Sequence, residues 1–172
     1  SLQKIVNRKG SRMKRENHFV VIGAGSLAIN TARELLRRGH PVTRILRTQP
    51  EGTEPVDGVG AIDYVVGDPN NNAVLREAGA QHAQAVLAMM VDDSENAFVI
   101  LAVKELGGKA RTVAAVNDAA HLSRVKLAQP DVIISPQVLG GELIAMVMSG
   151  ETVTPDFVMK HVFQRSADIS NS

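Results

Sequence analysis

The sequence has no cysteine and no tryptophan, and aromatic residues make up only 3% of its 172 residues. The absence of cysteine excludes disulfides, thiolate chemistry and cysteine-based zinc sites. The hydrophobic content of 44% is enough for a core, and the scarcity of aromatic residues predicts that this core is aliphatic and rich in alanine. Such a core is typical of a parallel sheet covered by helices.

Long apolar runs and a strong charge imbalance are also missing. No stretch reaches the roughly 20 apolar residues that span a bilayer, so we expect a soluble chain. The formal net charge is +1 and no basic stripe carries interleaved aromatic residues, so nothing favours a nucleic-acid partner. The five histidines are scattered without an H-x-x-x-H pair, and no metal site is predicted from them. Because the chain begins with Ser1 rather than Met, we expect it to be a piece of a longer protein.

The segment 18–39 has the order strand, glycine turn, amphipathic helix. Residues 19–22 form a β-branched and aromatic run that predicts a buried strand. Residues 26–38 then carry apolar side chains at helical spacing, and Gly39 is suited to end the helix. This order of elements indicates a nucleotide-binding βαβ unit rather than a chance glycine pattern.

The glycine turn itself has the residues that a phosphate site requires. Gly23 permits a tight turn, and Gly25 permits an anionic ligand to approach the backbone. The free N–H groups of Ser26 and Leu27 are predicted to face a phosphate at the positive end of the helix. Ala28 takes the third position of the fingerprint, where alanine is allowed. The alternative is that the glycines only make a turn and bind nothing.

Apolar runs alternate with helical patterns over most of the chain. The predicted strands are 19–22, 41–47, 61–66, 84–90, 110–116 and 131–135, and the predicted helices are 26–38, a helix started by Asp68-Pro69, 91–106, 119–128 and 137–149. Strands joined by crossover helices must be parallel. We therefore predict an α/β fold with a doubly wound, Rossmann-like, six-stranded parallel sheet, flanking helices and a short C-terminal tail.

The two ends of the chain differ from the domain of residues 18–150. Residues 1–17 are a basic arm, interpreted either as a solvated linker or as a segment close to an anionic membrane face. Residues 151–172 are a tail in which a short helix can follow Pro155, and residues 166–172 have the composition of a disordered end. The last helix, 137–149, is rich in methionine, which slightly favours packing on a partner subunit over core packing.

The second strand lacks the acid that takes the ribose hydroxyls in NAD sites. Leu46 occupies the expected position, and Arg47 follows it. Arg47 could bind a 2′-phosphate, as in NADP sites, or lie at the surface beside a degenerate pocket. Both interpretations stay open from the residues alone.

Acidic residues at the ends of two other strands also have two interpretations. Asp68 can cap a helix or contact a ligand, because it follows the third strand where ligands bind in such folds. Asp92, Asp93 and Glu95 suit the dipole of the helix that they begin, and a divalent-cation site is the alternative.

Three segments together resemble one family. They are IGAGSLA, VVGDPNNNAVLREAGAQHAQAVLAMMVDDSENAF and PDVIISPQVLGGELIAMVMSGE. Their order and content are similar to the RCK domain, also called KTN or TrkA-N, which regulates potassium channels and transporters. The resemblance extends from about residue 18 to residue 150 and is far more specific than the glycines alone.

The resemblance implies a place and a site. Such domains lie on the cytoplasmic side of a potassium pore, here the bacterial inner membrane, form homodimers and can assemble into gating rings. Their nucleotide contacts come from the glycine turn, the acid that ends the second strand and the Asp of the GD block. These positions are Gly23, Ala24, Gly25, Ser26 and Leu27, then Leu46, which departs from the pattern, and Asp68.

We therefore expect a ligand-sensing regulatory domain of a potassium channel and not an enzyme, because no catalytic set of His, Ser or Tyr–Lys stands out. The expected ligand is a nucleotide (NAD(P)(H), ATP, ADP or AMP), and an empty cleft is the alternative. Two other functions stay open, namely the dinucleotide-binding domain of an oxidoreductase and an oligomerisation module without a ligand.

Overall fold

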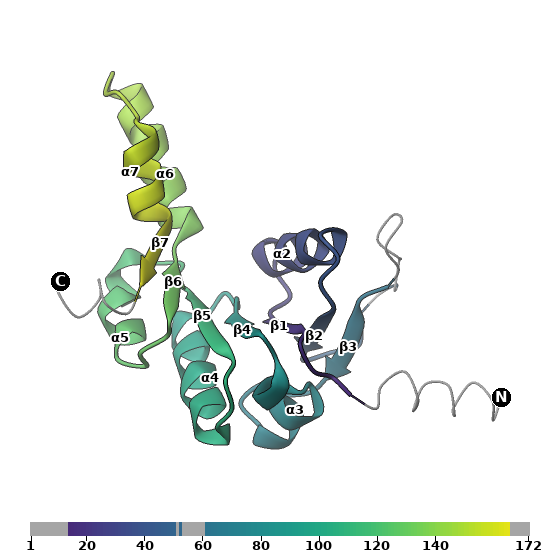
Figure 1. Ribbon diagram of the computed structural model, residues 1–172. Helices are drawn as coiled ribbons and strands as arrows, with labels where there is room; N and C mark the ends of the chain where they lie inside the picture. The colour runs from purple at the N-terminus through teal and green to yellow at the C-terminus, as the bar shows by residue number, and fades with distance from the viewer. Residues whose placement is uncertain (1–13, 51, 53–60, 166–172) are drawn as a thin grey trace.

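The computed structural model describes residues 14–50, 52 and 61–165. Within them, helices cover both faces of one sheet, and a pair of helices projects away from the body (Figure 1). The strands are β1 (Phe19–Ile22), β2 (Val42–Leu46), β3 (Asp63–Val66), β4 (Ala85–Ala88), β5 (Arg111–Ala115), β6 (Val132–Ile134) and β7 (Phe163–Arg165). The helices are α2 (Ser26–Arg37), α3 (Asn72–Glu77), α4 (Asp93–Leu106), α5 (Leu122–Lys126), α6 (Pro136–Met148) and α7 (Pro155–Val162), with short 3-10 turns η1 (Ala80–His82) and η2 (Ala119–His121).

The described strands are ordered β3-β2-β1-β4-β5-β6-β7, and the pairs from β3 through β6 are all parallel. This order confirms the predicted doubly wound, six-stranded parallel sheet. The chain winds outward from β1 in one direction through β2 and β3, then returns to the other side of β1 at β4. The reversal places a topological switch point at the carboxyl end of β1, where ligands bind in such folds.

The two faces of the sheet are covered unequally. On one face, Val21 packs with Ala28, Ala32 and Leu36 of α2. On the other face, α3, α4 and α5 cover a larger aliphatic cluster that includes Val20 (Figure 1). No helix occurs among the described residues between β2 and β3.

Three local predictions need correction. Asp68 does not begin a helix, because α3 starts four residues later and Asn71 caps it by accepting a hydrogen bond from the N–H of Ala73. The helix predicted over 119–128 is divided into the short turn η2 and the five-residue α5. The tail contributes an unpredicted strand, β7, which pairs antiparallel with β6. The helix expected after Pro155 is present as α7, whereas 166–172 and 1–13 lie outside the described residues.

The described end of the N-terminal arm is held at the amino edge of the sheet. Arg15 donates two hydrogen bonds to the carboxylate of Asp63, at 2.7 and 3.1 Å, and one to the carbonyl of Glu77 at 2.7 Å. The N–H of Asn17 donates to the carbonyl of His82 at 3.0 Å. The arm thus enters the domain at the edge opposite to the glycine turn.

Candidate functional site

Gly23 directly follows β1 and has a backbone conformation that other residues avoid. Its φ is +143°, and a Cβ added there would lie 2.4 Å from the carbonyl oxygen of Met89 and 3.1 Å from the Cβ of Ala28. Only glycine permits this close approach between the turn, β4 and α2. The contact fixes where α2 begins, directly above the carboxyl edge of the central strands.

Gly25 has a different role, because its backbone is ordinary. It is the N-cap of α2 with φ −83°, and no side chain caps the helix. A Cβ at Gly25 would meet only a methyl group of Val91 at 3.8 Å. By contrast, Asn71 and Asp92 cap α3 and α4 with their own side chains. The first backbone N–H groups of α2 therefore have no side-chain acceptor, and a bound phosphate could accept hydrogen bonds from them instead.

A cavity of about 580 Å³ lies beside the turn and over the ends of β2 and β3. This volume is within the range of small-molecule sites. Its described lining comes from the glycine turn, α2, both strands and the residues that follow them, and includes Ile22, Gly23, Ala24, Ile29, Arg33, Arg44, Ile45, Leu46, Arg47, Thr48, Gln49, Pro50, Gly52, Ile62, Tyr64, Pro69 and Met90. Of the predicted contact residues, Gly23, Ala24 and Arg47 line it directly.

Arg44 is the least expected residue of this cavity. It lies in the middle of β2, only 5% exposed, and donates a hydrogen bond from Nη2 to the carbonyl of Gly23. Its guanidinium lies 6.0 Å from the centre of the Tyr64 ring, and its Nε has no hydrogen-bond partner. Burial lowers the pKa of Arg44, Tyr64 partly opposes this, and the positive charge of Arg33 lowers it further.

Sequence reasoning missed Arg44, although the sequence carried a signal. All five residues of β2 are buried, and Arg44 is the charged residue in an otherwise uncharged strand. A charge in a strand expected to be buried on both faces indicates a polar partner or a ligand. The predicted basic residue at the end of this strand was Arg47 instead.

Arg47 lies at the rim of the cavity but already has acidic partners. Its guanidinium donates to the Glu95 carboxylate at 3.0 and 3.1 Å and lies 3.7 Å from Asp68. The hydrogen bonds to Glu95 raise the pKa of Arg47, and Asp68 adds to the effect. Arg47 therefore connects the end of β2 to the first turn of α4.

Asp68 is exposed and stabilises a turn. Its carboxylate accepts from the N–H of Asn70 at 2.9 Å, and this hydrogen bond, with the charge of Arg47, lowers the pKa of Asp68. The cavity lining includes the neighbouring Pro69 rather than Asp68 itself.

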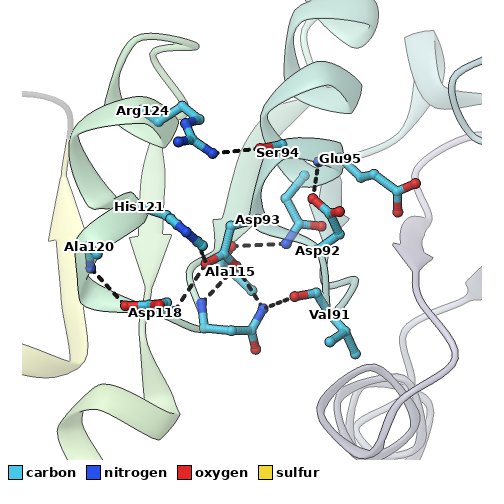
Figure 2. A network of polar contacts seen from close by, with 12 residues as sticks. Val91, Asp92, Asp93, Ser94, Glu95, Ala115, Asp118, Ala120, His121 and Arg124 are labelled. Atoms are coloured by element: carbon cyan, nitrogen blue, oxygen red, sulfur yellow. Dashed lines mark hydrogen bonds and ion pairs between the residues drawn. The ribbon is translucent and has the colours of Figure 1, made fainter.

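Asp93 organises a second polar network, at the switch from β4 to α4 (Figure 2). Its side chain is buried and accepts hydrogen bonds from three neighbours beyond β5. The N–H and side-chain amide of Asn117 lie at 2.8 Å, the N–H of Asp118 at 3.0 Å and Nδ1 of His121 at 3.0 Å. Burial alone would raise the pKa of Asp93, but these donors together lower it below its ordinary value.

The acidic residues at the start of α4 thus bind groups of the protein itself. Asp92 caps α4 by accepting from the N–H of Glu95, and Glu95 pairs with Arg47. Within residues 14–50, 52 and 61–165, no group of three or more His, Cys, Asp or Glu side chains is placed to hold a metal ion. The cation alternative for Asp92, Asp93 and Glu95 therefore has no support from the geometry.

Asn96 also connects the carboxyl ends of β4 and β5 with the start of α4, a contact region that we call the Asp93 junction. It is fully buried, accepts from the N–H of Met90 at 2.8 Å, and donates to the carbonyls of Met90 at 2.9 Å and Ala115 at 3.0 Å. A side chain that pairs three buried backbone groups is expensive to lose. Asn96 and Asp93 together hold the carboxyl ends of β4 and β5 against the start of α4.

The family of the chain follows from these features and from direct comparison. The TrkA-N domain family matches residues 19–136, from the first residue of β1 to the first of α6. The chain belongs to the TrkA-N (RCK) family. The match covers the glycine turn, the cavity and the Asp93 junction in one continuous segment.

Two of the curated proteins that this TrkA-N domain resembles are potassium channels. The chain is 37% identical to the voltage-gated potassium channel Kch of Escherichia coli over 159 residues, which are 91% of this chain and 38% of that protein. It is 26% identical to potassium channel protein 1 of Methanocaldococcus jannaschii over 145 residues, covering 84% of this chain and 42% of that protein. The chain thus spans about two fifths of the length of these relatives.

Among solved structures, the GsuK RCK domain matches with a TM-score of 0.64 and 26% identity, over 78% of this chain and 29% of that chain. No helix within the described parts of the chain is long and apolar enough to cross a membrane. The structural match confirms the Rossmann-like architecture expected for a TrkA-N domain.

The two glycines of the turn are expected to respond differently to alanine. Gly23→Ala should lower the free energy of unfolding by about 2 kcal/mol or more, because it combines backbone strain with a clash against Met89. Gly25→Ala should cost less than about 1 kcal/mol, the scale of a changed N-cap. Urea unfolding followed by circular dichroism tests this, and equal losses in both variants would contradict it.

The Asp93 network predicts a pH-dependent stability. Because folding lowers the pKa of Asp93, its contribution is present at neutral pH and is lost as the pH falls through the lowered value, below about 4. Asp93→Asn should cost about 2–3 kcal/mol at pH 7, since it removes an ionised acceptor from several donors. The difference between wild type and variant should shrink at pH 3.

Urea unfolding at both pH values measures this difference. Asp92→Asn is the matched control, because Asp92 is exposed and accepts one hydrogen bond, from the N–H of Glu95. A difference for Asp93→Asn that is the same at pH 7 and pH 3 would show that the carboxylate charge is not what stabilises the junction.

Proposed function

We propose that this chain is the cytoplasmic regulatory domain of a bacterial potassium channel, that it binds a nucleotide in the cavity beside the glycine turn, and that it is not an enzyme. The observation that carries the proposal is the site itself. The cavity of about 580 Å³ is lined by Gly23 and Ala24 at the switch point of the sheet, and the next residue, Gly25, has room at its Cα and precedes a helix start that no side chain caps. Membership of the TrkA-N family and the identity to Kch supply the channel context.

A nucleotide is the ligand class that these residues fit. The amides of Ser26 and Leu27 at the start of α2 suit a phosphate, and the apolar lining that includes Ile29 and Ile62 suits a base or sugar face. A related fold supports this choice, because the GsuK channel bound to NAD matches with a TM-score of 0.58 at 20% identity, over 70% of this chain and 21% of that chain. The residues of the chain would bind and orient the nucleotide without changing it.

The regulatory mechanism we infer is linkage between ligand and domain arrangement. A ligand that binds one arrangement of paired domains more tightly shifts the population toward it by its differential affinity. In the proposed organisation, the arm of residues 1–17 transmits this shift from the domain of residues 18–150 to a pore, and residues 151–172 form the tail. Arg15 ties the arm to Asp63 at the start of β3, a strand that also borders the cavity.

Pairing with a second copy is supported by exposed apolar side chains. Phe98 and Leu101 of α4 are 60% and 45% exposed, and Leu127 after α5 is 81% exposed. The α6 helix has no buried residue, although it is strongly apolar, and Met148 at its end is 81% exposed. Apolar surface of this extent indicates a protein interface, and we propose a homodimer through α4, α5 and α6 that can extend into a gating ring.

The two rival functions differ from this one in testable ways. An oxidoreductase domain needs a substrate and a group that transfers hydride or protons, and no such set converges on the described cavity lining. An oligomerisation module without a ligand would pair through the same helices but leave the cavity empty. A measurement of nucleotide binding therefore distinguishes an oligomerisation module from a ligand-sensing domain.

Nucleotide binding is expected to stabilise the domain and to require Gly25. A thermal-shift screen with NADH, NADPH, ATP, ADP and AMP should raise the midpoint for at least one of them, by mass action. Gly25→Ala should keep the fold and abolish most of that shift, because the added Cβ occupies the ligand's approach to the backbone. If no nucleotide raises the wild-type midpoint, the sensing function is wrong and the oligomerisation module is favoured.

The dimer is expected to depend on the exposed face of α4. Phe98→Asp combined with Leu101→Asp should convert the dimer to a monomer without lowering the free energy of unfolding of the protomer, because both side chains are exposed in it. Light scattering coupled to gel filtration measures the mass. Val66→Asp is the matched control, since Val66 is 42% exposed on β3, far along the sheet from α4 and α5. A double variant that stays dimeric would place the interface elsewhere.

A further inference from the structure

We propose that Arg33 and Arg44 form an anion subsite for the 2′-phosphate of NADP(H), so that the cavity selects the phosphorylated dinucleotide over NAD(H). This inference rests on the proposed nucleotide site and names the ligand that the site prefers. It assigns the selecting role to a buried residue of β2 and an exposed residue of α2. The arginine that follows β2, which the sequence indicated for this role, is not part of the subsite.

The first step is the missing acid at the end of β2. Leu46 is 8% exposed and lines the cavity where a carboxylate accepts the ribose hydroxyls in NAD sites. A leucine cannot accept a hydrogen bond, so the structure offers the NAD ribose no acceptor at this position. The same absence removes the negative charge that would repel a 2′-phosphate.

The second step is the buried positive charge of Arg44. In the described part of the chain no carboxylate lies within ion-pair distance of it, and its known partners are the Gly23 carbonyl and the Tyr64 ring. Its Nε is buried without a hydrogen-bond partner. A buried guanidinium with an unused donor is costly unless an anion completes it, and a phosphate is the anion that the planar guanidinium binds best.

The third step is the second arginine on the same cavity wall. Arg33 extends from α2 into the lining, close enough for its charge to lower the pKa of Arg44. Among the described residues, Arg33 also has no carboxylate partner, and the adjacent Glu34 pairs with Arg37 and Arg38 instead. Two like charges facing one cavity are stabilised by a doubly charged group placed between them, which is the charge of a phosphate monoester.

The fourth step excludes the alternative basic residue. Arg47 is neutralised by Glu95 at 3.0 Å and by Asp68 at 3.7 Å, so binding a phosphate there would require breaking an existing pair. Within the described residues, neither Arg33 nor Arg44 has such an ion pair to break. The arginines that select the ligand in this proposal are therefore those without an acidic partner, Arg33 and Arg44, and not Arg47, which follows β2 in the sequence.

The inference is tested by isothermal titration calorimetry of the whole chain with NADPH, NADH, 2′-AMP and 5′-AMP. NADPH should bind at least about tenfold tighter than NADH, the effect of one charge-assisted hydrogen bond or more. The two AMP isomers carry the same charge, so 2′-AMP competing with NADPH better than 5′-AMP does would show that the position of the phosphate is recognised. Equal affinity for NADPH and NADH would overturn the proposal.

Substitutions locate the effect. Arg33→Gln should weaken NADPH by about tenfold while leaving NADH nearly unchanged, and Arg44→Met should do the same. Because Arg44 is buried and its variant can misfold, the exposed Arg33 keeps the test decisive. Arg38→Gln, at the C-cap of the same helix and outside the cavity lining, is the matched control and should change neither affinity.

The failures of the two ideas are distinguishable. If NADH, ADP or AMP binds but NADPH is no tighter, or if Arg33→Gln weakens both dinucleotides equally, the 2′-phosphate subsite is wrong and the sensing function stands. If none of the nucleotides binds, the sensing function itself fails, and the subsite fails with it.

Discussion

The close approach of Gly23 to the backbone of Met89, directly after β4, is the constraint on which the site depends. With φ at +143° and 2.4 Å between its ideal Cβ position and the Met89 carbonyl oxygen, this residue cannot carry a side chain. The approach sets the start of α2 over the carboxyl edge of the sheet and leaves its first amides without a side-chain cap. It also places the Gly23 carbonyl where Arg44 can donate to it. The phosphate-type helix start and the buried arginine are therefore two consequences of one packed turn.

The architecture was predictable because local and long-range signals agree. Each predicted strand of the parallel sheet contains the observed one, and the α2 pattern ends within a residue of the observed helix. What could not be predicted depends on tertiary partners. β7 is a three-residue strand that exists through its pairing with β6, and nothing in its own pattern requires that pairing. Asp68-Pro69 has the composition of a helix start, but the carboxylate caps a turn to Asn70 instead.

The candidate site was predictable in its backbone and not in its charges. The glycine spacing located the turn, because a turn that needs small residues can be recognised from the glycines in the sequence. The roles of Arg47, Glu95 and Asp93 were not, because each depends on a partner from another strand or helix. Arg47 looks like a free ligand for phosphate until Glu95 is placed beside it. The charge of Arg44 in a strand of the sheet was visible in the sequence, but its partners, the Gly23 carbonyl and the Tyr64 ring, come from the turn after β1 and from β3 and were not visible there.

The strands β2 and β3 connect the cavity with the arm, which gives the regulation that we propose a physical basis. Thr43 and Asp63 form a hydrogen bond of 2.9 Å near the amino ends of β2 and β3, and Asp63 holds Arg15 of the arm. The next residues along these strands, Arg44 and Tyr64, are paired in register and point into the cavity lining. Because successive side chains of a strand alternate between faces, the arm contact of Asp63 and the proposed ligand contact of Arg44 lie on opposite faces of the same two paired strands. In the organisation that we propose, a ligand that neutralises Arg44 acts directly on the two strands that hold the arm.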